Sequence, residues 1–178
     1  MKNDVAEILF NERQISDIVT GIGARISEDY AGKKLVLISV LKGSLIFMAD
    51  LMRAVTIPCE IDFLSVSSYG SGSSTSGEVR MLKDLDASIE GKDVLVVEDI
   101  LDSGMTLKFL MENLSSRKPA SVRLCTLLDK PERRRVEIIP DYVGAQVEDK
   151  FIVGYGLDYA EKYRNLPYIG ALKPEIYM

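Results

Sequence analysis

The feature that most constrains the fold of this chain is the stretch from Val94 to Thr106, which reads VLVVEDILDSGMT. It begins with an unbroken apolar run, which is typical of a strand buried on both faces of a parallel sheet. Carboxylates and small residues follow, and after them apolar residues recur at helical spacing. A strand, an acidic turn and a helix in this order place the turn at the carboxyl edge of an open α/β sheet, where such folds bind ligands.

The rest of the chain repeats this alternation of strands and helices. Apolar runs at 35–40, 61–66 and 122–128 predict buried strands, and the spacing of apolar residues over 15–26 and 45–52 predicts amphipathic helices. Alternating elements indicate βαβ units. We therefore expect an α/β fold with a mainly parallel sheet flanked by helices, and a length of 178 residues predicts a single domain over 1–178.

The acidic turn combines features that suit two different parts of one ligand. The amides of Asp102, Ser103 and Gly104 enter a helix and are suited to binding a phosphate, and Gly104 allows a positive φ. The carboxylates of Glu98 and Asp99 would repel a phosphate but would accept hydrogen bonds from a diol or bind Mg²⁺. A phosphorylated ribose has both a phosphate for the amides and a diol for the carboxylates. The alternative is a plain strand–turn–helix whose acidic residues cap the helix.

A second turn, Leu41-Lys42-Gly43-Ser44, is predicted at the same edge of the sheet. Ser44 is expected to cap the following helix, and free amides there would suit a pyrophosphate. A short loop with a solvated lysine is the simpler alternative. The segment 67–84 (SSYGSGSSTSGEVRMLKD) is rich in serine and glycine. It is expected to be a mobile lid over the site, the alternative being an interdomain linker.

Composition excludes several kinds of chemistry. The chain has no histidine, which removes Ser-His-Asp and Cys-His schemes and leaves acid–base work to Asp, Glu, Lys or Tyr. A net charge of −5 gives no general attraction to polyanions, so no nucleic-acid partner is expected. Cys59 and Cys125 are expected to be free buried thiols. No apolar run is long enough for a membrane span and no signal-peptide pattern is present, so a cytoplasmic enzyme is expected.

Four motifs together resemble one family. VEDILDSGMTL is similar to the phosphoribosyl-diphosphate (PRPP) binding motif of the type I phosphoribosyltransferases. Within that family, its residues resemble those of the hypoxanthine/guanine branch. LKGS resembles the family's pyrophosphate loop, in which the peptide before the second residue, here Leu41–Lys42, is often cis. Ser68-Tyr69 matches the Ser-Tyr pair of its flexible loop, and KFIVGYGLDY is similar to its C-terminal hood. The resemblance extends from about Val36 to Arg164.

The resemblance implies transfer of the 5-phosphoribosyl group from PRPP to N9 of hypoxanthine or guanine, with Mg²⁺ as cofactor. Asp102 would accept the purine N7 proton, Lys130 would bind the 6-oxo group and Phe151 would cover the base. Arg134 is a weaker candidate for pyrophosphate contact. The residues implied to bind PRPP are Lys42, Gly43, Glu98, Asp99, Asp102, Ser103, Gly104, Met105, Thr106 and Arg164. Those implied to bind the purine are Lys130, Phe151, Ile152 and Asp158, and those implied to bind metal are Glu98, Asp99 and Asp158.

Two other functions remain compatible with the motifs. One is a PRPP-sensing, RNA-binding regulator on the same fold, which would need a basic surface that this acidic chain does not suggest. The other is a Mg²⁺-dependent phosphotransferase with Asp99 or Asp102 as an aspartyl nucleophile. The resemblance further implies a homodimer or homotetramer and no membrane partner.

Overall fold

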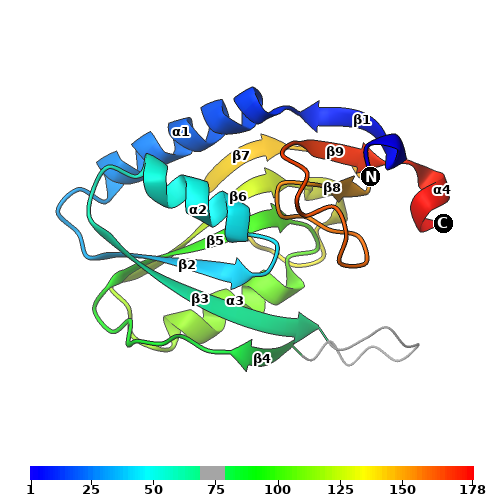
Figure 1. Ribbon diagram of the computed structural model, residues 1–178. Coiled ribbons are helices and arrows are strands. Elements are labelled where there is room, and N and C mark those ends of the chain that lie inside the picture. The colour runs from blue at the N-terminus through cyan, green and yellow to red at the C-terminus, as the bar shows by residue number, and fades with distance from the viewer. Residues whose placement is uncertain (69–78) are drawn as a thin grey trace.

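The computed structural model describes residues 1–68 and 79–178, and they form two sheets with helices packed around the larger one (Figure 1). The elements, in chain order, are β1 (Val5–Phe10), α1 (Glu12–Asp29), β2 (Leu35–Leu41), α2 (Leu45–Ala54), β3 (Cys59–Ser68), β4 (Val79–Lys83), β5 (Asp93–Leu101), α3 (Met105–Ser115), β6 (Ser121–Asp129), β7 (Tyr142–Gln146), β8 (Ile152–Val153), β9 (Ile169–Leu172) and α4 (Pro174–Tyr177). Short 3-10 helices occupy Lys2–Asp4 and Pro131–Arg133.

The larger sheet has the strand order β4-β3-β2-β5-β6-β7. Strands β3, β2, β5, β6 and β7 run parallel, and β4 is an antiparallel edge strand. This confirms the predicted α/β fold with a mainly parallel sheet. Because parallel strands end at one edge, the carboxyl ends of β2, β5 and β6 lie next to one another there, with Leu101 opposite Asp129.

Both faces of this sheet are buried, as the apolar runs predicted. Along β5, Leu95 and Val97 pack with the α1 and α2 side chains, whereas Val94 and Val96 pack with α3. All four have no exposed surface. Figure 1 shows α1 and α2 on one side of the sheet and α3 on the other. The alternation follows from strand geometry, in which successive side chains point to opposite faces.

The smaller sheet, ordered β1-β9-β8, forms the predicted C-terminal hood together with α4. Val5 pairs with Leu172, so the start of the chain forms an edge of the hood. The sequence did not indicate this contribution. Strand β1 (VAEILF) is only six residues long, and its apolar and polar residues do not alternate.

The polar segment 67–84 was predicted to be a mobile lid with too few apolar residues to pack, and this is wrong for its last part. Val79–Lys83 forms β4, which pairs with β3, and Met81 packs into the core on the α3 side. Residues of alternating burial on an edge strand need little apolar content, which explains why composition concealed the strand. Ser68 ends β3, and Tyr69, the other predicted lid residue, lies outside the described residues.

Two smaller expectations were also tested. Cys59 and Cys125 are both free, but only Cys125 is fully buried, and burial raises the pKa of both thiols. In the described part of the chain, no helix is both long and apolar enough to cross a membrane.

Candidate active site

The carboxylates Glu98 and Asp99 lie inside β5, which continues to Leu101, and not in the turn where the sequence placed them. Their surroundings differ, although Asp99 is near enough for its charge and a side-chain hydrogen bond, in addition to burial, to raise the pKa of Glu98. Glu98 lines a cavity in front of α3, while Asp99 is buried, with 6% of its surface exposed, and accepts a hydrogen bond from the Ile100 amide at 2.7 Å.

Glu98 provides a carboxylate oxygen that needs a ligand. Its Oε2 is buried and has no hydrogen-bond partner among residues 1–68 and 79–178. Burial, and then the charge of Asp99, raises the pKa of Glu98 well above its usual value. Burial also raises the pKa of Asp99. An unpaired buried oxygen is costly, so a hydroxyl or a cation bound beside Glu98 would lower the free energy of the site.

The turn after β5 has the form expected of a phosphate-binding loop. Gly104 precedes the first residue of α3 with φ +80°, which confirms the predicted positive φ. A Cβ at this position would lie 2.6 Å from Ile138 Cγ2, so glycine is also required by space. Together with Glu98 this turn lines a cavity of about 270 Å³, named here the loop cavity. Its lining residues are Val40, Leu41, Val66, Glu98, Ile100, Asp102, Ser103, Gly104, Thr106 and Leu107.

A second cavity of about 400 Å³ lies between the sheet edge and the hood, and is named here the hood cavity. Ile100 and Asp102 line both cavities, so Asp102 stands at their junction. The lining residues of the hood cavity are Ile100, Asp102, Lys130, Arg133, Asp149, Lys150, Phe151, Ile152, Leu157, Asp158 and Tyr177. The four predicted purine-binding residues are all among them.

Lys130 follows β6 directly and is the buried cation of the hood cavity, with 5% of its surface exposed. Its Nζ donates a hydrogen bond to the Lys150 carbonyl at 2.5 Å and lies 3.8 Å from Asp149 Oδ1. Burial lowers the pKa of Lys130, while Asp102 and Asp149 oppose that shift. The ammonium can donate three hydrogen bonds and accept none, so a ligand atom beside it has to be an acceptor.

Phe151 supplies an aromatic surface to the hood cavity. Its ring stacks on Tyr177 with centroids 4.8 Å apart and an interplanar angle of 26°, and Tyr159 meets it edge-on at 5.2 Å. It remains 36% exposed, so it is partly available to a flat ligand. Tyr177 was missed by sequence reasoning because α4 is a four-residue element outside every motif.

The predicted pyrophosphate loop connects β2 to α2, and its Leu41–Lys42 peptide is cis. Gly43 lies directly over Asp99, since a Cβ there would be 1.9 Å from Asp99 Oδ2. The expected side-chain cap is absent, because Ser44 Oγ donates to the Val40 carbonyl at 2.5 Å. That hydroxyl also shares a 2.7 Å hydrogen bond with Ser39. Ser44 therefore fastens the loop to β2 and leaves the amides at the start of α2 uncapped by its side chain.

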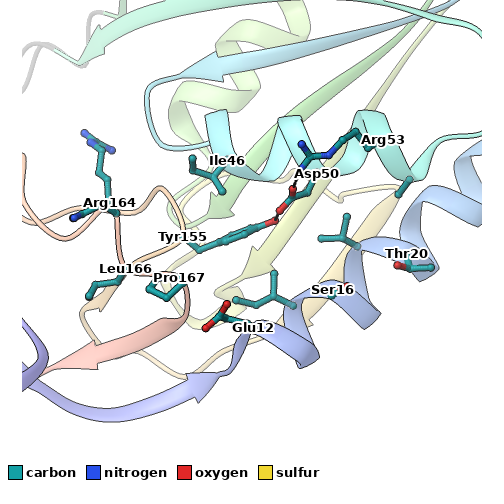
Figure 2. Close-up of a pocket in the computed structure, with 14 residues that line it drawn as sticks. Glu12, Ser16, Thr20, Ile46, Asp50, Arg53, Tyr155, Arg164, Leu166 and Pro167 are labelled. Atoms are coloured by element: carbon teal, nitrogen blue, oxygen red, sulfur yellow. Dashed lines mark hydrogen bonds and ion pairs between the residues drawn. The ribbon is translucent and has the colours of Figure 1, made fainter.

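Arg164 and Asp158 lie together on the hood side of this loop. Arg164 Nη2 lies 2.8 Å from Asp158 Oδ1, and Arg164 Nη1 donates to the Gly156 carbonyl at 2.8 Å. Arg164 also borders a groove of about 560 Å³ between α1, α2 and the hood. Figure 2 shows Tyr155 reaching from the hood to Asp50 of α2, a hydrogen bond of 2.5 Å that ties the hood to the helix.

Three charged residues that line the hood cavity were not predicted there, namely Arg133, Asp149 and Lys150. Arg133 Nε lies 3.3 Å from Asp102 Oδ1, and its Nη1 lies 3.2 Å from Asp149 Oδ1. The arginine run 133–135 gave no signal to separate this side chain from a solvated surface. Arg134, the weaker pyrophosphate candidate, is instead paired with the buried Asp129 beneath Gly104.

The site fits a magnesium ion held mainly by a substrate. Among the described residues, no three His, Cys, Asp or Glu side chains are grouped as a metal-binding cluster. Mg²⁺ commonly binds through one or two carboxylates, several waters and substrate phosphates. The unpartnered oxygen of Glu98 can supply one such ligand, and Asp158 is a second carboxylate facing the hood cavity.

Comparison with known proteins agrees with this geometry. The model of the phosphoribosyl transferase domain matches residues 5–160, and the chain belongs to this family. Within it, the chain is 53% identical over 177 residues to a hypoxanthine-guanine phosphoribosyltransferase of Staphylococcus aureus strain Mu50, covering 99% of each. The resemblance to the hypoxanthine/guanine branch is therefore confirmed.

Solved structures give the same result for the fold. A crystal structure of a hypoxanthine phosphoribosyltransferase from Staphylococcus aureus matches with a TM-score of 0.97 at 53% identity, covering 100% of this chain and 97% of the other. A ternary substrates complex of a Trypanosoma cruzi hypoxanthine phosphoribosyltransferase mutant matches with a TM-score of 0.94 at 46% identity, covering 99% and 100%.

Proposed function

We propose that this protein is a purine-salvage enzyme that transfers the 5-phosphoribosyl group of PRPP to N9 of hypoxanthine or guanine and releases pyrophosphate. The observation that carries the proposal is that Asp102 lines both the loop cavity and the hood cavity. A phosphorylated ribose in the first and a base in the second would meet beside its carboxylate. The identity to hypoxanthine-guanine phosphoribosyltransferases supports the same reaction.

In this account the loop cavity holds the ribose phosphate. The amides at the start of α3 bind the 5-phosphate, because the N-terminus of a helix presents free N–H donors and a partial positive charge. Glu98, whose Oε2 has no partner in the described structure, accepts a hydrogen bond from a ribose hydroxyl or a bond to the metal. Asp99 does not line this cavity. Its carboxylate packs against Gly43 of the pyrophosphate loop.

The hood cavity holds the base. Phe151 covers one face of the purine, and Lys130 donates to its 6-oxo group. As the bond from C1′ to the pyrophosphate oxygen breaks, N9 of the base forms the new bond to C1′, and Asp102 accepts the proton from N7. Negative charge develops on the leaving pyrophosphate, which the amides of the Lys42 loop and the Arg164 guanidinium stabilise.

Magnesium is the proposed cofactor: Glu98 would help to hold one ion in the loop cavity, and Asp158 would help to hold a second in the hood cavity, each together with substrate oxygens. When bound, it neutralises charge on the leaving pyrophosphate.

A homodimer or homotetramer is supported by exposed apolar side chains of α2, where Leu45 and Met52 are 45% and 38% exposed. A solution mass of 19.8 kDa, that of one chain, would contradict it.

The RNA-binding alternative gains no support. The chain carries 22 basic and 27 acidic residues, and a protein that binds phosphate backbones needs a basic surface.

The test of the proposed function is Asp102→Asn, which keeps the shape of the side chain but cannot accept a proton. We expect kcat with PRPP and hypoxanthine to fall roughly 10²- to 10⁴-fold, the usual effect of losing a general base. The Kd for PRPP, measured by calorimetry, should stay within about threefold of the wild-type value. A variant that turns over within about twofold of the wild type would leave Asp102 with the role of a loop residue only.

A further inference from the structure

The Glu161 carboxylate lies between the two basic side chains that border the pyrophosphate loop. Its Oε2 is 3.0 Å from Lys42 Nζ, and its Oε1 is 3.3 Å from Arg164 Nη2. The hydrogen bond from Lys42, followed by its charge, holds the pKa of Glu161 below the usual value, so the group is ionised at neutral pH. Lys42 and Arg164 thus share one anion from the same chain, and Arg164 is also paired with Asp158.

The backbone places Glu161 there at some cost. Tyr159 and Lys162 exchange hydrogen bonds of 3.2 and 3.0 Å, which makes Ala160 and Glu161 the two tip residues of a tight hairpin. Their φ values are +50° and +60°. A two-residue turn with both φ values positive favours Asn-Gly, and non-glycine side chains there are strained. Asp158 Oδ2 accepts a hydrogen bond from the Glu161 amide at 2.9 Å, which stabilises the turn.

Resting on the proposed function, we propose that Glu161 is a displaceable internal anion of the pyrophosphate site. The pyrophosphate end of PRPP replaces the Glu161 carboxylate at Lys42 and Arg164 on binding. The carboxylate returns as pyrophosphate leaves, which weakens product binding and speeds its release. The Lys42 pair is well exposed and the Arg164 pair is partly exposed, so each ion pair contributes little stabilisation. Their loss on displacement therefore lowers pyrophosphate affinity by only a small factor.

The test is calorimetric titration of magnesium pyrophosphate into the full chain and three variants. Glu161→Gln removes the charge, and Glu161→Asp keeps the charge but shortens the arm that reaches both cations. We expect both to bind pyrophosphate roughly two- to fivefold more tightly than the wild type. Glu90→Gln makes the same change of charge at an exposed residue before β5, and should bind as the wild type does.

Three outcomes would contradict the displacement of Glu161, and a fourth would contradict the proposed function as well. If Glu161 merely orients Lys42 and Arg164, both Glu161 variants bind pyrophosphate more weakly, and the proposal is wrong. If Glu161→Asp binds as the wild type does and only Glu161→Gln binds more tightly, general charge repulsion accounts for the effect and displacement is contradicted. A wild type that converts PRPP to nucleotide, with unchanged affinity in both variants, overturns this inference alone. A wild type that makes no nucleotide and binds no pyrophosphate overturns the proposed function as well.

Discussion

At the scale of single residues, we propose that the choice of base depends on the hydrogen-bond donors of Lys130. Its ammonium is buried and can only donate, so it matches the O6 acceptor of hypoxanthine or guanine. Adenine places an amino group at the same position, and a buried donor facing a donor costs roughly 1–3 kcal/mol, or more when charged. Adenine should therefore be a poor substrate.

Lys130→Gln tests this assignment, because a glutamine amide can accept as well as donate. We expect the ratio of kcat/KM for hypoxanthine to that for adenine to fall roughly tenfold or more in the variant. Lys34→Gln makes the same change of charge at an exposed residue before β2 and should leave the ratio unaltered. A ratio that is the same in all three proteins would show that Lys130 does not select the base.

The residues of the site differ in how well the sequence could predict them. Asp102 and Gly104 were predictable because strand, turn and helix patterns fix their place at the sheet edge. The environment of Asp99 was not predictable, since it depends on β5 continuing four residues beyond the apolar run. Arg133 and Tyr177 reach the hood cavity through tertiary packing alone, which no local pattern encodes.

At the scale of elements, the pyrophosphate loop and β5 are in direct contact at Gly43. Any Cβ there would lie 1.9 Å from the buried Asp99 carboxylate, which is itself held by the Ile100 amide. Gly43→Ala must therefore move either the loop or the carboxylate, and displacing packed groups typically costs about 1–3 kcal/mol. We expect its Tm to fall by several degrees and the KM for PRPP to rise.

Gly21→Ala is the matched control for this substitution. Gly21 lies in α1, and a Cβ there would have no neighbouring atom within 4 Å, so alanine should raise the stability by about 0.5–1 kcal/mol. A Gly43→Ala protein with wild-type Tm and wild-type KM for PRPP would show that the loop does not depend on this contact.

Elements whose apolar residues recur at regular spacing were predicted correctly from the sequence, and some of the short elements were not. Of the apolar residues predicted to face the core from α1, Ile15, Val19, Ile22 and Ile26 are buried and Ile18 is partly buried. Strand β4 was not predicted because the residues around it are polar. Strand β1 was not predicted because its apolar and polar residues do not alternate regularly. Such strands form because a neighbouring strand offers unpaired backbone groups, which is information that their own residues do not carry.

At the scale of the whole molecule, the site is assembled from three strand ends of the larger sheet and from the hood. The sheet brings the ends of β2, β5 and β6 together (Figure 1), and the hood borders the hood cavity with Phe151 and Tyr177. The hood in turn needs both ends of the chain, since β1 pairs with β9. The parallel sheet was predictable from alternating elements, whereas the partnership of the two ends was not.

The central claim is that these two cavities form one site for joining a phosphoribosyl group to a 6-oxopurine. The measurement that tests it most directly is product analysis of the wild-type protein with PRPP and each of hypoxanthine, guanine, xanthine, adenine and uracil, with Mg²⁺ or with EDTA. We expect nucleotide and an equal amount of pyrophosphate from hypoxanthine or guanine, little from adenine or uracil, and no turnover in EDTA until Mg²⁺ is restored. Nucleotide formed as readily from adenine, or full turnover without metal, would contradict the account.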